Sequence, residues 1–582
     1  SKIEVCPVPS QRGDDMQCPR DAMPLLQWLR RAAVRCTVKA ISPGRQLSLF
    51  QQHLEAVLWS FLRQATRVPR DFATIGAALD WAPAWPPTTI LVGAGSYKEE
   101  LLFQKPVTLL ADREQGQVKL LCSGVATPVR FQLKGQAAAA AELHGFQVES
   151  DASCVTVEEG AACVVDCRLS AKRGFGVSVA GSAAATVVAS HFSGNKKAAV
   201  TFKDSATGIV RRCTFEDNLS VGILGRNEAS PKLEGNVLTR TRMAAIMFRD
   251  HVAGVVKQNL LENNDGCGIE LCEEAHPHVE ANTLRGHTMP AVMLRGRTSG
   301  TVVRNTIEAN LGLGIMVCGT AHPKLLENRL RANRKHGGDA AGQRRINAQV
   351  SALRASAKAV AADKAVAAVE AAPAAPRAVT EQVRAAAAEA RTEAARAADE
   401  AAVLTLGAAV SSKGGGKRAA IIVQDESAPL VKANVLDAND GYGILVCHVA
   451  QPVVEDNELN GHHRPAIALR DKTKCVVRGN KLCDNDFGIM VCDEARPTIE
   501  KNELSGHGRA GILVKDAAAG VVRSNHVVDN RSVGILVCDT AAPALEDNVL
   551  SGLRFPHIAF QAGTSGSARR NCLAAGGGRP PP

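Results

Sequence analysis

The stretch NTIEANLGLGIMVCGTAHPKLLEN, which runs from Asn305 to Asn328, is one copy of a repeat that fills most of the chain. Asparagine recurs at this spacing of 23 residues on both sides of it, with one step of 22 and one longer gap. A β-branched run, Val302-Val303, precedes Asn305, a second run begins at Gly314, and a third follows Pro323. The asparagines of this column are Asn236, Asn259, Asn282, Asn305, Asn328, Asn434, Asn457, Asn480, Asn502, Asn525, Asn548 and Asn571.

Runs this short, separated by Gly, Asn, Asp and Pro, favour β-strands over helices. No strand can pair within so small a coil, so we expect each strand to pair with its copy in the next coil. The sequence therefore predicts an all-β solenoid, a parallel β-helix of three sheets. Asparagine suits the turn because it tolerates left-handed backbone and because its amide can bond the amides stacked above and below. A leucine-rich or helical repeat would need an LxxLxL or helical spacing, which is missing.

A second period of 46 residues, equal to two coils, is superimposed on the 23-residue period. It continues across the longer interval between Asn328 and Asn434. The gap from Asn328 to Asn434 is 106 residues, one coil of 23 plus 83 more. We therefore expect an insertion in one turn of one continuous solenoid. Alternate coils carry Cys272, Cys318, Cys447, Cys492 and Cys538, and the coils between carry Arg295, Gln424, Arg470, Lys515 and Gln561 at the same place.

The predicted organisation has four parts. They are a helical leader or cap at 1–70, the first part of the β-helix at 71–336, an Ala-rich helical insertion at 337–417, and the rest of the β-helix with a C-terminal tail at 418–582. In the leader, Met23 to Val38 and Gln46 to Gln64 have helical spacing and are expected to cap the strands at the solenoid end, with a docking module as the alternative. A short helix at Ala73 to Trp81 and strands at Thr89 to Val92 and Val107 to Leu110 are expected next.

The insertion is rich in Ala, Glu, Lys and Arg. Gln343 to Glu370 and Val379 to Leu404 are strong helix formers, split by Pro373 and Pro376. Its apolar residues are mostly alanines, which can bury little surface. We expect a helical arm at 343–404 that projects from the solenoid, mobile or ordered by a partner; an unstructured segment is the alternative.

The composition argues against nucleic-acid binding and favours the cytoplasm. A net charge of +11 is spread along the chain, and two Tyr and four Trp offer few stacking platforms. The 17 cysteines are expected to be core residues with free thiols, because alternate coils lie about 10 Å apart, too far for a disulfide. The start of the sequence carries no apolar signal segment, and no run of apolar residues is long enough to span a membrane.

Two parts of the chain resemble known families. The segment Gly95-Ser96-Tyr97-Lys98-Glu99 is similar to the G-x-Y-x-E of pectin methylesterases, in the first coil of their right-handed parallel β-helix. The repeats from about 210 to 571 resemble the carbohydrate-binding and sugar-hydrolase repeat class, and most closely the β-helix region of F-box-only substrate receptors of ubiquitin ligases. The resemblance rests on phrases such as Asn310 to Ile315 and Ala321-His322-Pro323, and it implies a right-handed coil. An F-box pattern is not recognisable in the leader.

The acids and histidines of the repeats are the candidate catalytic or metal-binding residues. Glu262 with Asp265 and Asp484 with Asp486 are the densest acidic pairs, but general acid–base chemistry needs carboxyls at a defined separation. Stacked acids at a turn could form a calcium site, although such acids are also common turn formers. Gly506-His507-Gly508 is similar to the polygalacturonase G-H-G, but His507 shares its repeat position with His287 and His462. We predict no catalytic residue, cofactor or metal. The acids considered are Asp217, Asp265, Asp440, Asp484, Asp486 and Asp529, and the histidines also include His276 and His322.

The function predicted from these observations is a non-catalytic scaffold that binds other proteins, with the arm at 343–404 as one docking element. An extension of this hypothesis places it in a cytoskeletal or ciliary assembly in the cytoplasm. Two alternatives stay open: a substrate-recognition subunit for ubiquitin ligation, which the F-box resemblance implies, and a protein that binds or cleaves polysaccharide.

Overall fold

The computed structural model describes residues 66–84, 87–112, 116–134, 140–333, 388, 418–553 and 556–574. The expected leader helices at Met23 to Val38 and Gln46 to Gln64 lie outside these residues. So does the expected arm, apart from Ala388, which is helical and exposed. From Val68 onward the described residues belong to one compact unit, in which the regular secondary structure is β-strand apart from one short helix and Ala388.

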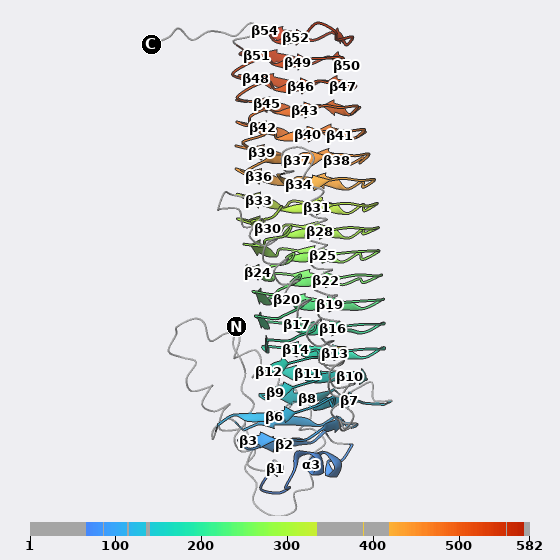
Figure 1. Cartoon of the computed structure of the whole chain (residues 1–582), viewed down its shortest axis with the longest axis vertical. Helices are drawn as coiled ribbons and strands as arrows, with labels where there is room; N and C mark the ends of the chain where they lie inside the picture. Colours follow the sequence, from blue (N-terminus) through green and yellow to red (C-terminus); the bar gives the residue numbers. More distant parts are fainter. Residues whose placement is uncertain are drawn as a thin grey trace, which may run out of the picture. The chain divides into compact units, whose positions relative to one another are not determined.

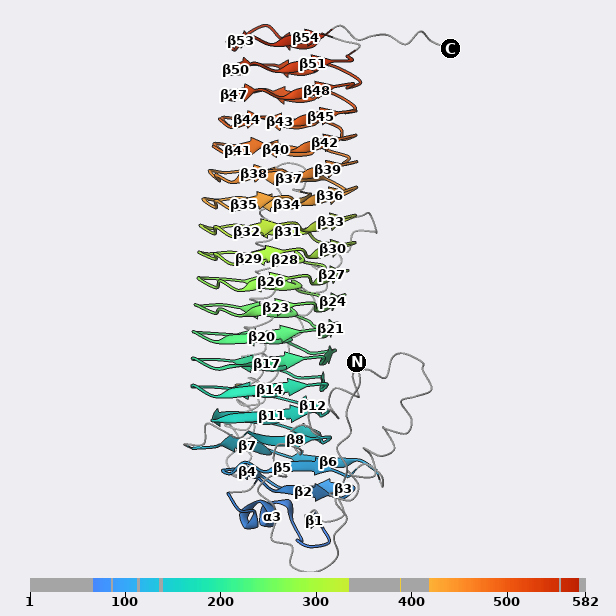
Figure 2. The same ribbon diagram turned by 180° about the vertical axis from the view of Figure 1, so that it is seen from behind.

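Three parallel sheets run along a stack of coils, which confirms the predicted fold (Figure 1 and Figure 2). In the coil of Asn305, β29 (Thr301–Val303) belongs to sheet A, β30 (Thr306–Glu308) to sheet B and β31 (Ile315–Val317) to sheet C. The chain then returns to sheet A with β32 (Lys324–Leu326), whose Leu325 pairs with Val302. In the described residues the three sheets hold 19, 18 and 17 strands.

One strand of each coil differs from expectation. The runs at Val302-Val303 and after Pro323 occupy the same repeat position, so they belong to one sheet and not to two. The third sheet, B, is formed by the residues directly after each asparagine, such as Thr306–Glu308. Only its middle residue, Ile307, is apolar and buried, because a three-residue strand turns just one side chain inward. That single residue is too weak a signal for a strand.

The long insertion at 334–417 does not interrupt the stacking of the coils. On its two sides β31 pairs with β34 (Ala419–Val423), β32 with β35 (Leu430–Lys432), and β33 (Arg329–Arg331) with β36 (Val435–Asp437). All three ladders therefore close across the insertion as they do between any two coils.

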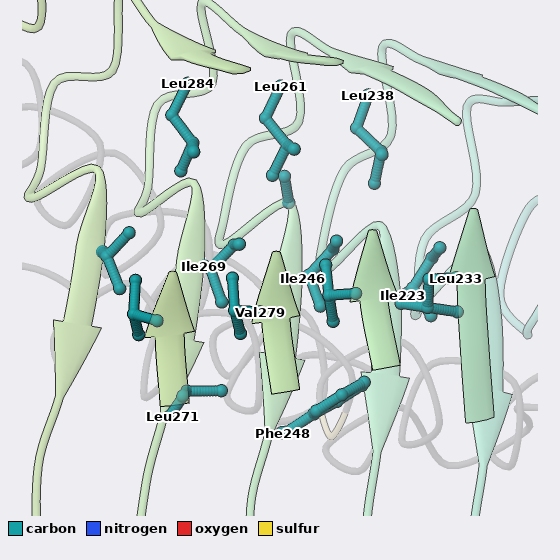
Figure 3. Close-up of a cluster of buried hydrophobic side chains, with 14 of the residues drawn as sticks. Ile223, Leu233, Leu238, Ile246, Phe248, Leu261, Ile269, Leu271, Val279 and Leu284 are labelled. Carbon is teal, nitrogen blue, oxygen red and sulfur yellow. The ribbon is translucent and has the colours of Figure 1, made fainter. Parts of the chain in front are cut away.

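The core is a set of columns, one for each inward position of each sheet. Ile223, Ile246 and Ile269 of sheet C face columns from sheets A and B across the core (Figure 3). These side chains are 0% exposed, and burying one such side chain contributes about 1.5–3 kcal/mol. A glycine such as Gly314 precedes several of the sheet C strands, and it is also explained: a Cβ on Gly314 would lie 2.6 Å from the backbone oxygen of Ala420 in the next coil.

A short helix precedes the first coils. It is α3 (Ile75–Trp81), which starts later than the expected Ala73 because Thr74 is its N-cap and accepts a hydrogen bond from the Ala77 N–H at 3.1 Å. Glu99 of the G-x-Y-x-E segment accepts from the N–H groups of Ile75 (3.2 Å) and Gly76 (2.8 Å) at the same helix end. The segment therefore has a structural role here. Strand β2 (Thr89–Val92) matches its predicted range and β5 (Thr108–Ala111) begins one residue late.

The structure places the twelve repeat asparagines in one column between sheets A and B. From Asn236 to Asn571 each Nδ2 donates to the Oδ1 of the next asparagine at 2.9–3.0 Å, including the step from Asn328 to Asn434. Each Oδ1 also accepts the backbone N–H of the preceding asparagine, as in Asn305 to Asn328 at 3.0 Å. The left-handed residue is the one before the asparagine, such as Arg304 with φ 54°, so the amide and not the backbone conformation explains why asparagine recurs.

Candidate functional site: the outer face of sheet C

The outer faces of the three sheets differ in chemistry, and sheet A carries alternating charges. In consecutive coils Lys432, Glu455 and Arg478 lie in register, followed by Glu500 and Arg523. Lys432 Nζ is 2.9 Å from Glu455 Oε1, and Arg523 Nη2 is 2.6 Å from Glu500 Oε2. Hydrogen bonds from Lys432 and Arg478 lower the pKa of Glu455. The charged side chains of this face therefore pair with one another.

Reversing one charge of this column should weaken the stack. Glu455→Lys would place three cations in consecutive coils, and we expect it to lower the free energy of unfolding by about 1 kcal/mol. Urea unfolding at low and high salt measures this loss, which salt should reduce because it screens like charges. Glu455→Gln is the control and should lose less. Equal losses for both variants would show that charge alternation does not contribute.

The outer face of sheet B is polar and holds a shallow basin of about 790 Å³. Gln147, Glu149, Arg168, His191 and Ser193 contribute to its lining, and they come from strands β9 (Gln147–Ser150), β12 (Arg168–Ala171) and β15 (His191–Ser193). Arg168 and His191 are register partners in adjacent coils. With Asp166, which also lines it, the basin offers two acids, two basic side chains and several hydrogen-bonding groups to a polar molecule.

The outer face of sheet C is apolar over most of its length. In each of these strands one residue that lies between two inward-facing residues points away from the core. From β19 to β52 these outward residues form one register column, here called the outer stripe. Its members are Leu224, Met247, Glu270, Met293, Met316, Ile422, Leu445, Ala468, Met490, Leu513, Leu536 and Ala559. Eleven of these twelve are apolar, whereas a solvated sheet face normally alternates polar residues outward.

In the described residues, 17 strands form sheet C, which carries the outer stripe. They are β4 (Leu101–Phe103), β7 (Val129–Gln132), β10 (Val155–Glu159), β13 (Val177–Val179), β16 (Val200–Phe202), β19 (Ile223–Gly225), β22 (Ile246–Phe248), β25 (Ile269–Leu271), β28 (Val292–Leu294), β31, β34, β37 (Tyr442–Val446), β40 (Ile467–Leu469), β43 (Ile489–Val491), β46 (Ile512–Val514), β49 (Ile535–Val537) and β52 (Ile558–Phe560).

Further apolar and aromatic residues widen this surface at the turn that enters sheet C. Leu219, Met243 and Leu311 are 47%, 48% and 41% exposed there. Arginines lie over aromatic rings on the same side, with Arg464 5.3 Å from the Tyr442 ring centroid and Arg509 5.2 Å from that of Phe487. An apolar surface with Met, aromatic and Arg residues has the composition of protein-binding patches.

The turn that leaves sheet C carries a column of acids. Asp471 and Asp516 accept the backbone N–H groups of His448 (2.7 Å) and Asp493 (3.2 Å) in the preceding coils. Asp471, Asp493 and Asp516 have left-handed φ values of 58–61°, where a side chain that bonds the backbone is favoured. Like the asparagine column, this column is a set of stacked hydrogen bonds.

Two groups of side chains at this turn are of types that bind metal ions. They are Cys447 with His448 and Asp471, and Cys492 with Asp493 and Asp516. Within each group the ligand atoms lie within 4.8 Å of one another. The carboxylates are already engaged, because Asp516 Oδ2 also pairs with Lys515 Nζ at 2.6 Å. Burial raises the pKa of the Cys492 thiol to about 11, which opposes the thiolate that zinc requires. The residues therefore do not fit a zinc site well.

Further along the same turn is a cavity of about 540 Å³ lined by Asp250, His251, Glu273, Glu274 and neighbouring residues. Its acids are partnered: Glu273 accepts from Arg249 Nη2 at 2.8 Å and from the Asp250 N–H at 2.9 Å. Glu274 lies 2.9 Å from His251 Nε2. No pair of free carboxylates lines this cavity in the described part of the chain.

Cys154, Cys167, Cys213 and Cys475 lie in the main core cluster, as expected, but the cysteines of the 46-residue period do not. They follow the last residue of each sheet C strand, outside the main core cluster. They are nevertheless covered, since Cys272, Cys447 and Cys492 are buried and Cys318 and Cys538 are half-buried. Burial raises the pKa of Cys272 and Cys318 to about 11. The 14 cysteines among the described residues are reduced thiols.

Thiol labelling should separate these cysteines from an exposed one. We expect Cys572 to react with iodoacetamide at pH 8 at least about tenfold faster than Cys272 or Cys492, because only the thiolate reacts. Mass spectrometry of peptides after timed labelling gives the individual rates. Comparable rates would contradict the covered positions that the structure gives to the period-46 thiols.

The structure does not bring the sequence-derived acids together as a catalytic pair. Asp217, Asp484 and Asp529 are left-handed turn residues, and Asp217 is 2.7 Å from Arg240 Nε. Asp440 and Asp486 lie 3.4 Å and 3.2 Å from the arginines Arg418 and Arg509. Glu262 pairs with Arg285, and the backbone oxygen of Asp265 accepts from the Thr288 hydroxyl. His276 and His322 are exposed, and Gln424-Asp425-Glu426 is the turn after β34.

A second column of buried amides was missed by the sequence reasoning. It lies five residues after the first, between sheets B and C, and holds asparagines such as Asn310 and Asn333, joined by an Nδ2–Oδ1 hydrogen bond of 2.8 Å. His287, His462 and His507 belong to this column and are 0–2% exposed. They are therefore turn residues whose side chains are buried. The signal was present: asparagine recurs here with the same period, at Asn195, Asn218, Asn264, Asn310, Asn333, Asn439, Asn485 and Asn530.

The chain is similar in fold to several solved structures. The periplasmic alginate epimerase AlgG is 11% identical with a TM-score of 0.30, over 82% of this chain and 85% of that one. The A-module of the Azotobacter vinelandii mannuronan C-5 epimerase AlgE6 is 11% identical with a TM-score of 0.29, over 87% and 95%. A mannuronic acid specific polysaccharide family 6 lyase from human gut microbiota is 9% identical with a TM-score of 0.30, over 79% and 82%. These similarities extend to the fold alone.

Sequence comparison identifies the family. No curated protein matches the chain at a significant level. None of the described helices is long and apolar enough to cross a membrane. A family model described as the right-handed β-helix region matches residues 131–284, 245–352 and 417–572, which together are more than half of the chain. Most of the stacked three-sheet coils fall in the matched ranges, and the chain belongs to the right-handed β-helix family.

Proposed function

We propose that the protein is a non-catalytic interaction scaffold that binds partner proteins through the outer stripe of sheet C. The observation that carries the proposal is the run of eleven apolar residues among twelve outward positions. Sheets A and B offer no comparable surface, because the one is charged and self-paired and the other is polar.

The geometry of the outer stripe suits an extended apolar partner. Its side chains lie in register, about 4.8 Å apart from coil to coil. Met247, Met293 and Met316 are flexible and polarizable, so they can adapt to the shape of a partner. Glu270, the one charged member, is paired with Arg295 at 2.9 Å and so adds a polar position within the stripe.

Substitutions on two faces of the same coils test the proposal. The double variant Met247→Lys with Met293→Lys places charges on the outer stripe, and Val237→Lys with Thr283→Lys places them on sheet B of the same coils. Tagged full-length protein would be purified from extract of its own cells and analysed by cross-linking mass spectrometry. We expect partners that cross-link to Lys203 and Lys515, which border sheet C, and at least about tenfold lower recovery with the sheet C variant only.

Equal recovery of the partners by both double variants would overturn the proposal. A ubiquitin-ligase adaptor among the recovered proteins would favour the form of the proposal in which the scaffold presents substrates. Cytoskeletal or ciliary proteins would favour the structural assembly.

The second candidate function is polysaccharide binding or cleavage in the sheet B basin. Arg168, His191 and Glu149 give this basin an anion-binding group, a base and an acid. Binding and cleavage of alginate and pectate oligosaccharides would be assayed with and without calcium. We expect Arg168→Ala to remove binding to an anionic chain if the basin is the site, and the absence of binding and cleavage by the unmodified protein would eliminate this candidate.

A further inference from the structure

A cluster of buried residues lies on the outside of sheet C, separate from the main core. It consists of Ala419, Ile422, Tyr442, Leu445 and Ala468, with Leu313 and Met490 packed against it, and we name it the satellite cluster. Ile422 and Leu445 belong to the outer stripe, yet they are 2% and 1% exposed. Met293, Met316 and Leu536 occupy the same position in other coils and are half-buried. The outer face is therefore more deeply covered at this point than elsewhere along the stripe.

The satellite cluster lies where the insertion rejoins the solenoid. The described chain stops at Asn333 and resumes at Arg418, directly before Ala419 of β34. Arg418 is held at this edge, since its carbonyl accepts the Tyr442 N–H at 2.8 Å and its guanidinium lies 3.4 Å from Asp440. Satellite apolar clusters in proteins are characteristically found under long connections.

The sequence of the insertion fits an apolar sheet face. Ile346, Val350 and Leu353 recur at the four- and three-residue spacing of one helical face, and alanines continue that face. A helix over Gln343 to Glu370 would be about 42 Å long. The satellite cluster extends over five coils from Leu313 to Met490, or about 20 Å. Either predicted helix is long enough to cover it, and small alanines allow a helix to approach a sheet closely.

We propose that the segment 343–404 docks on the satellite cluster of its own chain. This segment then covers the sheet C face around the insertion point and leaves the coils of Leu224, Met247 and Met293 for a partner. The proposal stands on the burial of the satellite cluster and not on the scaffold function.

Hydrogen exchange with mass spectrometry on the full-length protein tests the docking. In Leu445→Lys a charge would lie in the satellite cluster, and peptides from 343–404 are expected to exchange about tenfold or more faster than in the unmodified protein. Leu536→Lys is the matched control, since it makes the same change in the same column four coils away, and it should leave these peptides unchanged. Exchange of 343–404 at equal rates in all three proteins would overturn the proposal.

A second variant guards against a local loss of folding. Val350→Asp with Leu353→Asp changes the segment and leaves the sheet intact, and it should accelerate exchange across 343–404 while peptides of β34 and β37 keep their protection. If protection of the segment disappears on tenfold dilution of the unmodified protein, a second copy of the chain is the occupant and the proposal is wrong. The two proposals can fail separately. Faster exchange of 343–404 with unchanged partner recovery would support docking alone, and lower partner recovery with unchanged exchange would support the scaffold function alone.

Discussion

Acidification from pH 6.5 to pH 4 is expected to remove a large part of the free energy of unfolding through three buried histidines. Burial lowers the pKa of His287, His462 and His507 from 6.5 to about 4. Nδ1 of His462 and of His507 accepts the backbone N–H groups of Asn439 (3.3 Å) and Asn485 (3.2 Å), so a proton on Nδ1 would oppose an N–H donor. The neutral form is therefore the one that fits the column.

The direction of the effect follows from the lowered pKa. The unfolded chain binds these protons below pH 6.5 and the folded chain only below about pH 4, so the contribution is fully present above pH 6.5 and is lost progressively down to pH 4. Each histidine contributes about 3 kcal/mol, from roughly 2.5 pKa units at 1.36 kcal/mol per unit. The stabilisation from salt-bridged acids is lost only at lower pH. Hydrogen bonds from Lys257 and Arg304, for example, lower the pKa of Glu280 to about 2.

Urea unfolding between pH 4 and 7 measures this loss, and the chain offers a matched variant. Asparagine occupies the same column in neighbouring coils, so the triple variant of His287→Asn, His462→Asn and His507→Asn should fold and should lose most of the dependence between pH 6.5 and 4. His276→Asn with His322→Asn, at exposed positions, is the control and should keep it. A triple variant with the dependence of the unmodified protein would show that the buried histidines are not responsible.

Asn457→Ala is expected to lower the free energy of unfolding by about 4 kcal/mol, because it breaks the asparagine column in the middle of the stack. Asn457 donates to Asn480 Oδ1 and to the Val431 carbonyl, both at 2.9 Å, and its Oδ1 accepts from the N–H and Nδ2 of Asn434. Alanine leaves the buried backbone N–H of Asn434 without its acceptor, whereas Asn434 Nδ2 keeps the Leu325 and Lys432 carbonyls. An unsatisfied buried group costs about 1–3 kcal/mol, and the other hydrogen bonds of the Asn457 amide contribute about 1 kcal/mol each.

Urea unfolding followed by circular dichroism measures the loss, with two further variants for comparison. Asn571→Ala removes the last asparagine of the column, which is half-buried, and should cost about 1 kcal/mol. Asn434→Ala, directly after the insertion, should cost as much as Asn457→Ala, since Asn328 bonds it at 3.0 Å across the gap. A cost below about 1 kcal/mol for Asn457→Ala would contradict the energetic role of the column.

The repeat spacing was enough to predict a stack of parallel coils, because each 23-residue copy must place like residues in register. It was not enough to place the third strand, since Thr306–Glu308 buries one side chain only. It also misplaced Cys272 and its equivalents in the core, because a period says which residues align and not on which side of a sheet they point. The same limit concealed the outer stripe, whose methionines and leucines resemble core residues in the sequence.

For the candidate sites, the sequence located the acids and histidines but not their surroundings. The arginines that pair with Asp217 and Glu262 come from the next coil. The His462 side chain is buried because it points inward at the turn. The packing of the neighbouring coils determines the direction in which it points.

The sequence by itself determined the coil length, the parallel stacking and the register across the insertion. A fixed period leaves only one way for identical turns to hydrogen-bond. Only the tertiary structure decided which apolar residues face the core and which form the outer stripe of sheet C. Three-residue strands expose or bury a side chain according to where the chain turns, and that is set by the packing of the coils above and below.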